Sequence, residues 1–170
     1  MNHQEIIGHL HINRDVFKHL FHDISDEQAR WKPGKGRWSM LEVINHLYDE
    51  EREDFRKRLG LVLDRPDAPW PPIDPERWVV ERSHNEKNPT KSLDNFINER
   101  ERSLAWLNGL ESPHWQAAHK HPKMGRMSAE LILANWLAHD LFHIRQANDL
   151  HFAWLKKIVA PVPLDYSGWE

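Results

Sequence analysis

Four long segments of this chain repeat their apolar residues at intervals of three and four positions, the spacing of one face of an α-helix. No run between them alternates apolar and polar residues as a half-buried strand does. The sequence therefore predicts an all-α fold, a four-helix bundle formed by a single domain over residues 1–170. The predicted helices span about residues 2–24, 39–63, 92–110 and 128–150.

Two serines mark helix starts. Ser39 and Glu42 form the S-x-x-E pattern of a capping box, in which each side chain accepts a hydrogen bond from the other residue's backbone N–H. Ser128 can cap the fourth helix in a similar way. That helix can continue past residue 150 to Val159, because the first proline after it is Pro161.

The segments between the helices are rich in residues that break helices. Residues 64–89 contain six prolines as well as Trp70 and Trp78, so we expect a long loop between the second and third helices. A loop of this length usually either covers a site or is disordered, and its two tryptophans favour packing. Residues 111–127 are also predicted to form a loop, and residues 161–170 an extended tail.

Composition excludes several classes of site. The chain has no cysteine, so it can form no disulfide, cysteine nucleophile, iron–sulfur cluster or cysteine-ligated zinc site, and any metal must be held by His, Asp or Glu. The net charge of −3 provides no positive field that attracts nucleic acid. Because signal-peptide and membrane-span patterns are also missing, we expect a cytoplasmic protein with no membrane or nucleic-acid partner.

The predicted inward face of the fourth helix interrupts its apolar residues with polar ones. Buried polar groups need partners, so this face either meets polar groups of another helix or lines a cavity. His139 and His143 lie one turn apart and can bind a common metal ion. With 13 histidines in the chain, about one such pair is expected by chance, so two satisfied core histidines are the alternative. The residues on this arc are Ile132, Asn135, Trp136, His139, Phe142, His143, Gln146 and Leu150.

His46 on the second helix is the natural third ligand. It lies at the edge of that helix's apolar arc, where it can face a crevice of the bundle or simply mark the boundary of the core. Glu50 and Glu53 share its side of the helix, and a carboxylate there can orient the imidazole or act as a base. The other acidic residues of this stretch are predicted to form a solvated face: Asp49, Glu51 and Asp54.

A second apolar stripe lies on the opposite side of the fourth helix. A helix that is apolar on two sides is buried on two sides. Either the proline-rich loop or a second copy of the chain covers this stripe, and a homodimer is one of the two expectations. The stripe consists of Leu133, Leu137, Leu141 and Ile144.

The sequence resembles the DinB/YfiT-like superfamily of metalloenzymes over nearly the whole chain. Residues 37–51, RWSMLEVINHLYDEE, are similar to the family segment W-S-x-x-E-x-x-x-H-L, and residues 135–146, NWLAHDLFHIRQ, match H-x-x-x-H-x-x-Q. The intervening HPKMG resembles the HP-x-x-G loop of the YfiT-like branch. The resemblance implies a four-helix bundle and a divalent metal bound by His46, His139 and His143.

The resemblance also implies a type of chemistry. Three imidazoles leave open positions on a zinc, nickel or iron ion, as a catalytic metal requires. Family members with assigned activity include transferases of low-molecular-weight thiols, and others are described as hydrolases. We therefore expect transfer of a thiol cosubstrate to an electrophilic small-molecule substrate, the alternatives being a metal-dependent hydrolase and a non-catalytic metal-binding or stress-response module. The expected orienting residues beside the metal are Glu50, Asn135 and Gln146.

Overall fold

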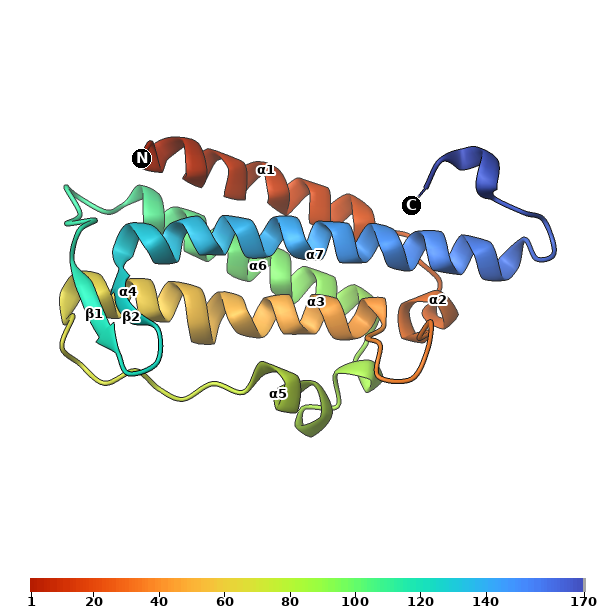
Figure 1. Cartoon of the computed structure of the whole chain (residues 1–170), viewed down its shortest axis with the longest axis horizontal. Helices are drawn as coiled ribbons and strands as arrows, with labels where there is room; N and C mark the ends of the chain where they lie inside the picture. The colour runs from red at the N-terminus through yellow and green to blue at the C-terminus, as the bar shows by residue number, and fades with distance from the viewer. Residues whose placement is uncertain (170) are drawn as a thin grey trace.

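A computed structural model describes residues 1–169 and contains four long helical segments that lie side by side (Figure 1). The final helix packs along the first helix and along the second half of the second segment, and the third packs against both the first and the second. This arrangement is a four-helix bundle. The segments are α1 (His3–Phe21), the continuous run of α3 (Met40–Asp49), the π-helical turn η1 (Glu50–Phe55) and α4 (Arg56–Asp64), α6 (Pro89–Asn108), and α7 (Ala129–Ile158).

The helix starts predicted from serines are present. The Ser39 hydroxyl accepts a 3.1 Å hydrogen bond from the Glu42 backbone N–H, and the Glu42 carboxylate accepts one of 2.9 Å from the Ser39 backbone N–H. Ser128 accepts a 3.3 Å bond from the backbone N–H of Leu131. From that cap α7 runs without a break for 30 residues.

The proline-rich segment between α4 and α6 is not wholly a loop. It contains the helix α5 (Pro75–Glu81) and the short 3₁₀ turn η2 (His84–Glu86). Asp74 caps α5 by accepting a 3.2 Å bond from the Arg77 backbone N–H. Proline is tolerated in the first turn of a helix, where its missing N–H would have no partner, so Pro75 begins this helix rather than preventing it.

The expectation of a purely helical fold is wrong for the segment between α6 and α7. There β1 (Ala118–His121) and β2 (Gly125–Ser128) form an antiparallel hairpin. His121 stabilises its turn, since its Nδ1 accepts hydrogen bonds from the backbone N–H groups of Lys123 and Met124. Gly125 has a φ of +75°, a conformation that favours glycine. The HPKMG segment therefore closes this hairpin.

The two terminal segments differ from the prediction in detail. The first helix ends at Phe21 and is followed by the separate short helix α2 (Asp26–Arg30), which Ser25 caps. The tail is not extended throughout, because Asp165–Ser167 form the 3₁₀ turn η3. Residue 170, which the prediction included, lies outside the described residues.

Two apolar clusters fill the bundle. One occupies the end formed by the first half of α3 and the last turns of α1, and the other occupies the opposite end, around α4 and the first turns of α7. Every long segment carries buried polar residues between the parts that enter the two clusters, and His46 lies at the edge of the first cluster, just before Leu47. We call this set the polar layer: Asn13, His46, Glu50, Glu51, Arg100, Asp140 and His143.

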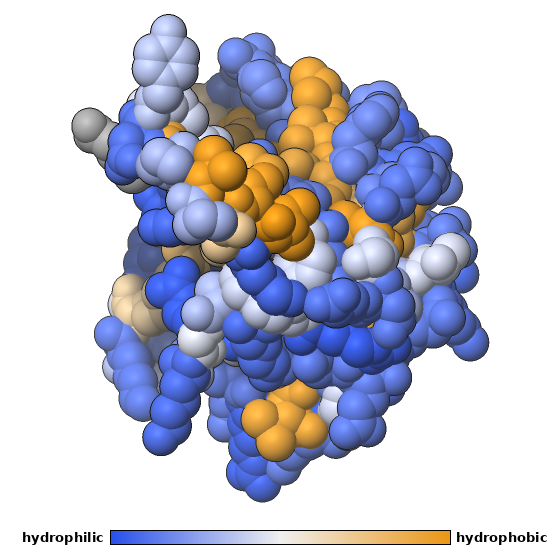
Figure 2. All heavy atoms as spheres, turned by 90° about the vertical axis from the view of Figure 1, so that its right-hand side faces the viewer, coloured by the Kyte–Doolittle hydropathy of each residue, from blue (hydrophilic) through white to orange (hydrophobic). Residues whose placement is uncertain are grey.

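The surface is largely hydrophilic, with an apolar patch at one end. Figure 2 shows this patch on the end of the molecule where α7 and the tail finish, and the exposed apolar residues there include Leu155, Ile158 and Val162. The second stripe of α7 is divided, with Leu133 buried and Leu141 57% exposed. The homodimer stays a prediction. Among residues 1–169, no helix is long and apolar enough to span a membrane.

Candidate metal centre

Three histidines meet where α3 faces α7. The Nε2 atom of His46 lies 3.3 Å from Nε2 of His139 and 3.2 Å from Nε2 of His143, and the last two are 3.1 Å apart. His139 and His143 come together because they lie one turn apart on one helix, and His46 reaches them from α3. The structure thus brings together all three residues that the sequence singled out.

These nitrogen positions fit a divalent metal. Nitrogen ligands that bind zinc tetrahedrally at about 2.0–2.1 Å lie about 3.3–3.4 Å from one another, close to the separations found here. Three ring nitrogens converging at this distance also leave little space for three N–H protons. The donor set and its spacing therefore suit an ion that takes neutral imidazoles and keeps open positions.

The three imidazoles are neutral at ordinary pH. Burial lowers the pKa of His46 to about 3, assisted by the nearby His143 and His84. Burial likewise lowers the pKa of His139 to about 2, and its histidine neighbours act in the same direction. The pKa of His143 falls to about 4, because burial outweighs the opposing hydrogen bond to Gln146. Neutral imidazole is the form that binds metals.

Gln146 fixes the orientation of one ring. The Nδ1 atom of His143 lies 2.7 Å from the Gln146 side-chain oxygen, so Nδ1–H donates there and leaves the Nε2 lone pair pointing toward the other histidines. The Nδ1 atom of His46 is buried and has no hydrogen-bond partner within residues 1–169. Its ring packs instead against Trp38, with the centroids 4.9 Å apart.

Asn135 does not join the site. Its side chain is exposed and donates to the backbone oxygen of Leu131 on its own helix. Glu53 does not orient His46 either, because its carboxylate pairs with Arg52 and Arg82. Residues that share a helical arc with the histidines therefore do not all reach the site. Asn135 and Glu53 make other contacts instead.

Glu50 is the carboxyl group at the site. It is only 5% exposed, it lines the same cleft as the three histidines, and its Oε1 atom is buried with no hydrogen-bond partner in the described part of the chain. Burial, followed by the charge and hydrogen bond of Asp54, raises its pKa to about 8. Glu50 begins the π-helical turn, a feature that often occurs at functional sites and that the helical periodicity of the sequence did not predict.

The histidines open into a cleft of about 990 Å³. One wall comes from the loop before α3 and another from the start of α5, so the segment predicted to cover a site does line this one. Aromatic and charged side chains share the remaining surface. The aromatic and charged residues of the lining include Arg37, Trp38, Asp74, Glu76, Phe142 and Arg145.

A buried ion-pair network lies next to these histidines and was not predicted. Arg100 is 1% exposed and pairs with both Glu51 and Asp140, and Trp136 donates its indole N–H to Glu51 at 3.1 Å. Asn13 of α1 also donates to Asp140, at 3.3 Å. The network therefore joins all four long segments directly beside His139 and Glu50.

The expectation of a solvated acidic face on the second helix is wrong for two of its residues. Asp49 is 4% exposed and Glu51 is 1% exposed. Cations from later segments neutralise both, namely Arg82 for Asp49 and Arg100 for Glu51. Asp54 is less deeply placed and pairs with Arg58. The partners are distant in sequence, so helical spacing alone gave no signal for this burial.

Comparisons with known proteins agree with the fold. Residues 9–147 match the sequence model of the DinB superfamily. The structure is similar to that of YfiT from Bacillus subtilis, with a TM-score of 0.77 and 21% sequence identity, over 87% of this chain and 85% of YfiT. YfiT is described as a probable metal-dependent hydrolase with an unusual four-helix bundle topology. A search of curated proteins found no match.

Proposed function

Because the chain belongs to the DinB superfamily, we propose that it is a metal-dependent enzyme that holds a divalent ion between His46, His139 and His143. The observation that carries this proposal is the approach of three neutral imidazole nitrogens to within 3.1–3.3 Å of one another. A zinc, nickel or iron ion held by these histidines would lower the pKa of a thiol or water and so supply a nucleophile near neutral pH.

The reaction we propose is transfer of a low-molecular-weight thiol to an electrophilic small molecule. At about 990 Å³ the cleft is at the upper end for small-molecule sites and has room for a thiol and an electrophile together. Arg37 and Arg145 face it along with Asp74 and Glu76, a mixture of charges that suits a thiol bearing carboxylate and amino groups. Since the chain has no cysteine, the thiol arrives as a cosubstrate.

Glu50 is the residue of this chain placed to move a proton. Its carboxyl group lines the cleft beside the histidines, and its raised pKa of about 8 means that it holds a proton near neutral pH before a metal binds. It can give this proton to the electrophile as the carbon–sulfur bond forms, and the carboxylate that remains can take up the proton released by the next thiol. Its free Oε1 atom is available for this exchange.

Metal-dependent hydrolysis is the second candidate. The fold neighbour YfiT is described in these terms, and the Glu50 carboxylate, once it has given up its proton, could accept one from a water molecule. A third possibility is a metal-binding or stress-response module in which the ion only stabilises the bundle. The first two candidates differ in whether a thiol is needed, and the third predicts no turnover.

Metal content is the first test of the proposal. Protein made without a histidine tag and never exposed to a nickel column is analysed for its elements, alongside a variant with His46, His139 and His143 all changed to alanine. Exposed histidines bind stray metal, so the matched control changes His11, His19 and His22, which are exposed, to alanine. We expect about one metal ion per chain in the wild type and the control and almost none in the site variant.

Activity is the second test. Metal-loaded protein is incubated with model electrophiles and common cellular thiols, and separately with ester and amide substrates without thiol. Conjugation that exceeds the uncatalysed reaction and that His139→Ala abolishes would support thiol transfer. Hydrolysis without thiol would select the second candidate. If His139→Ala lowers only the melting temperature and no turnover is found with any substrate, the metal is structural.

A further inference from the structure

A second pocket lies on a different side of α3 from the histidine cleft. It is enclosed by the end of α3 and η1, by the η2 turn, and by the first turns of α6, and its volume is about 370 Å³. No residue that lines it also lines the histidine cleft. This pocket therefore has its own lining and is not an arm of the candidate metal centre.

The pocket carries an excess of positive charge. Four cationic side chains line it, from Arg52, Arg82, Lys87 and Lys91, against the single carboxylate of Asp49. Such an excess is unusual in a chain whose net charge is −3. The pocket is thus set apart electrostatically from the protein as a whole.

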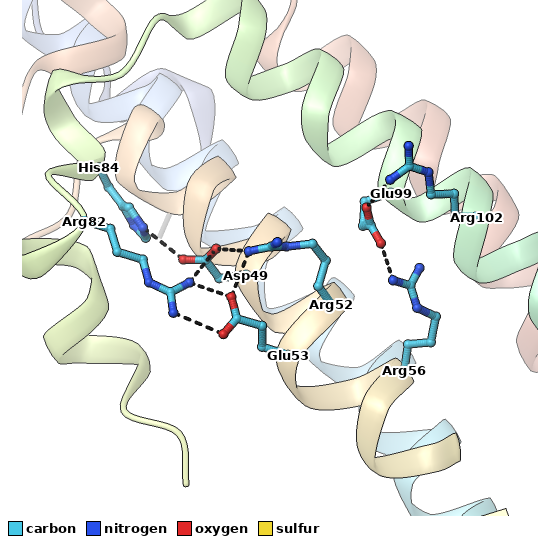
Figure 3. Close-up of polar contacts among 8 residues, drawn as sticks. All are labelled: Asp49, Arg52, Glu53, Arg56, Arg82, His84, Glu99 and Arg102. Carbon is cyan, nitrogen blue, oxygen red and sulfur yellow. Dashed lines mark hydrogen bonds and ion pairs between the residues drawn. The ribbon is translucent and has the colours of Figure 1, made fainter. Parts of the chain in front are cut away.

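The two arginines are held in place by two carboxylates. Arg82 lies 2.9 Å from Asp49 and 2.7 Å from Glu53, and Arg52 lies 3.2 Å and 2.7 Å from the same two residues (Figure 3). Each guanidinium also stacks on an aromatic ring, Arg52 on Tyr48 at 4.3 Å and Arg82 on Trp78 at 4.1 Å. These four ionic groups balance one another and fix the position of the arginines.

The two lysines supply the uncompensated charge. Lys87 and Lys91 are exposed, and neither has an ion-pair partner within residues 1–169. Lys91 belongs to the first turn of the 20-residue helix α6, whose cap Asn88 also lines the pocket. The amino end of a helix adds partial positive charge that favours anions.

A buried histidine of this pocket has unused hydrogen-bonding capacity. His84 is 2% exposed, and its Nε2 atom lies 3.0 Å from the Asp49 carboxylate. Its Nδ1 atom is buried and has no hydrogen-bond partner among the described residues. Because Nε2–H donates to the Asp49 carboxylate, the free Nδ1 atom is an acceptor, and a hydroxyl of a bound molecule or a water is the partner that it can take.

We propose that this pocket binds a small phosphomonoester. A phosphate dianion matches the two uncompensated lysine charges, and fixed guanidinium groups beside lysine are suited to phosphate oxygens. The volume admits a phosphate with a small organic group but no polymer. Tyr48 also lines the pocket, and the part of its side chain that Arg52 does not cover can contact that organic group. This inference is independent of the reaction proposed for the histidine cleft.

Titration with inorganic phosphate tests the proposal. Binding is measured by calorimetry at constant ionic strength, because screening alone changes surface electrostatics. The test variant is Lys87→Ala with Lys91→Ala, and the matched control is Lys120→Ala with Lys123→Ala, which removes the same charge from exposed positions of the hairpin. Circular dichroism checks that both variants are folded.

We expect saturable phosphate binding by the wild type and the control, and affinity at least about tenfold weaker in the test variant. Phenyl phosphate or glycerol phosphate should bind more tightly than inorganic phosphate. His139→Ala separates this pocket from the metal centre and should leave phosphate affinity unchanged. Three results would overturn the assignment. They are phosphate binding that does not saturate, an equal loss of phosphate affinity in the two lysine variants, and a loss of phosphate binding in His139→Ala but not in the lysine variants.

Discussion

Arg100 holds Asp140 through two hydrogen bonds of 2.7 Å, one from each terminal nitrogen of the guanidinium to a separate carboxylate oxygen. The same guanidinium reaches Glu51 at 2.7 and 2.9 Å on another helical segment. All three groups are almost completely buried. The pKa of Arg100 is raised, because the two carboxylates outweigh the effect of burial.

Removal of this cation should therefore destabilise the bundle strongly. Arg100→Met leaves two carboxylates buried without their partner, and we expect it to lower the free energy of unfolding by about 3–5 kcal/mol. Denaturant unfolding measures the loss. Arg102→Met is the control, since Arg102 pairs with Glu99 but is 73% exposed, and it should cost less than about 1 kcal/mol. Equal losses in the two variants would show that the buried network contributes no more to the free energy of unfolding than an exposed ion pair does.

Gln146 should tune metal binding without holding the metal. Gln146→Ala removes the acceptor of the His143 Nδ1–H, and loss of such a group typically lowers metal affinity about 10- to 100-fold. Competition with a chelator of known affinity measures the change. Asn135→Ala on the same helix should leave the affinity unaltered, because its amide bonds only to its own helix. An unchanged affinity in Gln146→Ala would remove this residue from the site.

Glu50 should make the metal-free protein less stable as the pH rises. Its pKa is about 8 in the folded protein against an ordinary 4.5, so folding requires uptake of a proton between these values. Glu50→Gln removes that requirement. Near pH 4.5 the variant and the wild type should have the same melting temperature. Between pH 4.5 and 8 the melting temperature of the variant should exceed that of the wild type by a growing margin. Above pH 8 this margin should stay constant.

Thermal unfolding of the chelator-treated proteins from pH 4.5 to 9 tests this pH dependence. Glu101→Gln changes an exposed carboxylate and serves as the control, with a difference from the wild type that does not vary in this way. A Glu50→Gln curve parallel to that of the wild type over the whole range would show that Glu50 is ionised in the folded protein.

Ser39 should contribute more to stability than Ser128, the other serine that caps a long helix. Both hydroxyls accept a backbone N–H, but Ser39 also completes a capping box and donates to the Asn85 side chain at 2.6 Å. We expect Ser39→Ala to cost about 1–2 kcal/mol and Ser128→Ala about 0.5–1 kcal/mol. Urea unfolding of the two variants measures the order, and the reverse order would contradict this account of the Ser39 contacts.

Local spacing accounts for what the sequence could predict. The Ser39 and Ser128 caps and the approach of His139 to His143 each depend on residues within four positions of one another. The start of α5 also depends on neighbouring residues, because Asp74 followed by Pro75 is a recognisable helix start. The prediction missed it because it took the prolines of residues 64–89 only as helix breakers.

Long-range pairing accounts for what the sequence could not predict. Arg100 is 49 residues from Glu51 and 40 from Asp140, so nothing in the acidic stretch after His46 reveals that Glu51 is buried. The π-helical turn begins at Glu50, so the α-helical spacing that places Glu50 on the side of His46 does not hold for the residues after it. Helical periodicity assumes 3.6 residues per turn and fails at such a turn.

The position of the polar layer between two apolar clusters has a consequence for how the sequence can diverge. Side chains at one end of the bundle can change size and be compensated by neighbours of their own cluster, without adjustment at the other end. The residues of the polar layer cannot vary in this way, because the charges of Glu51, Arg100 and Asp140 each require a partner on a different helix. Variation should therefore accumulate independently at the two ends of the molecule around an unchanging centre.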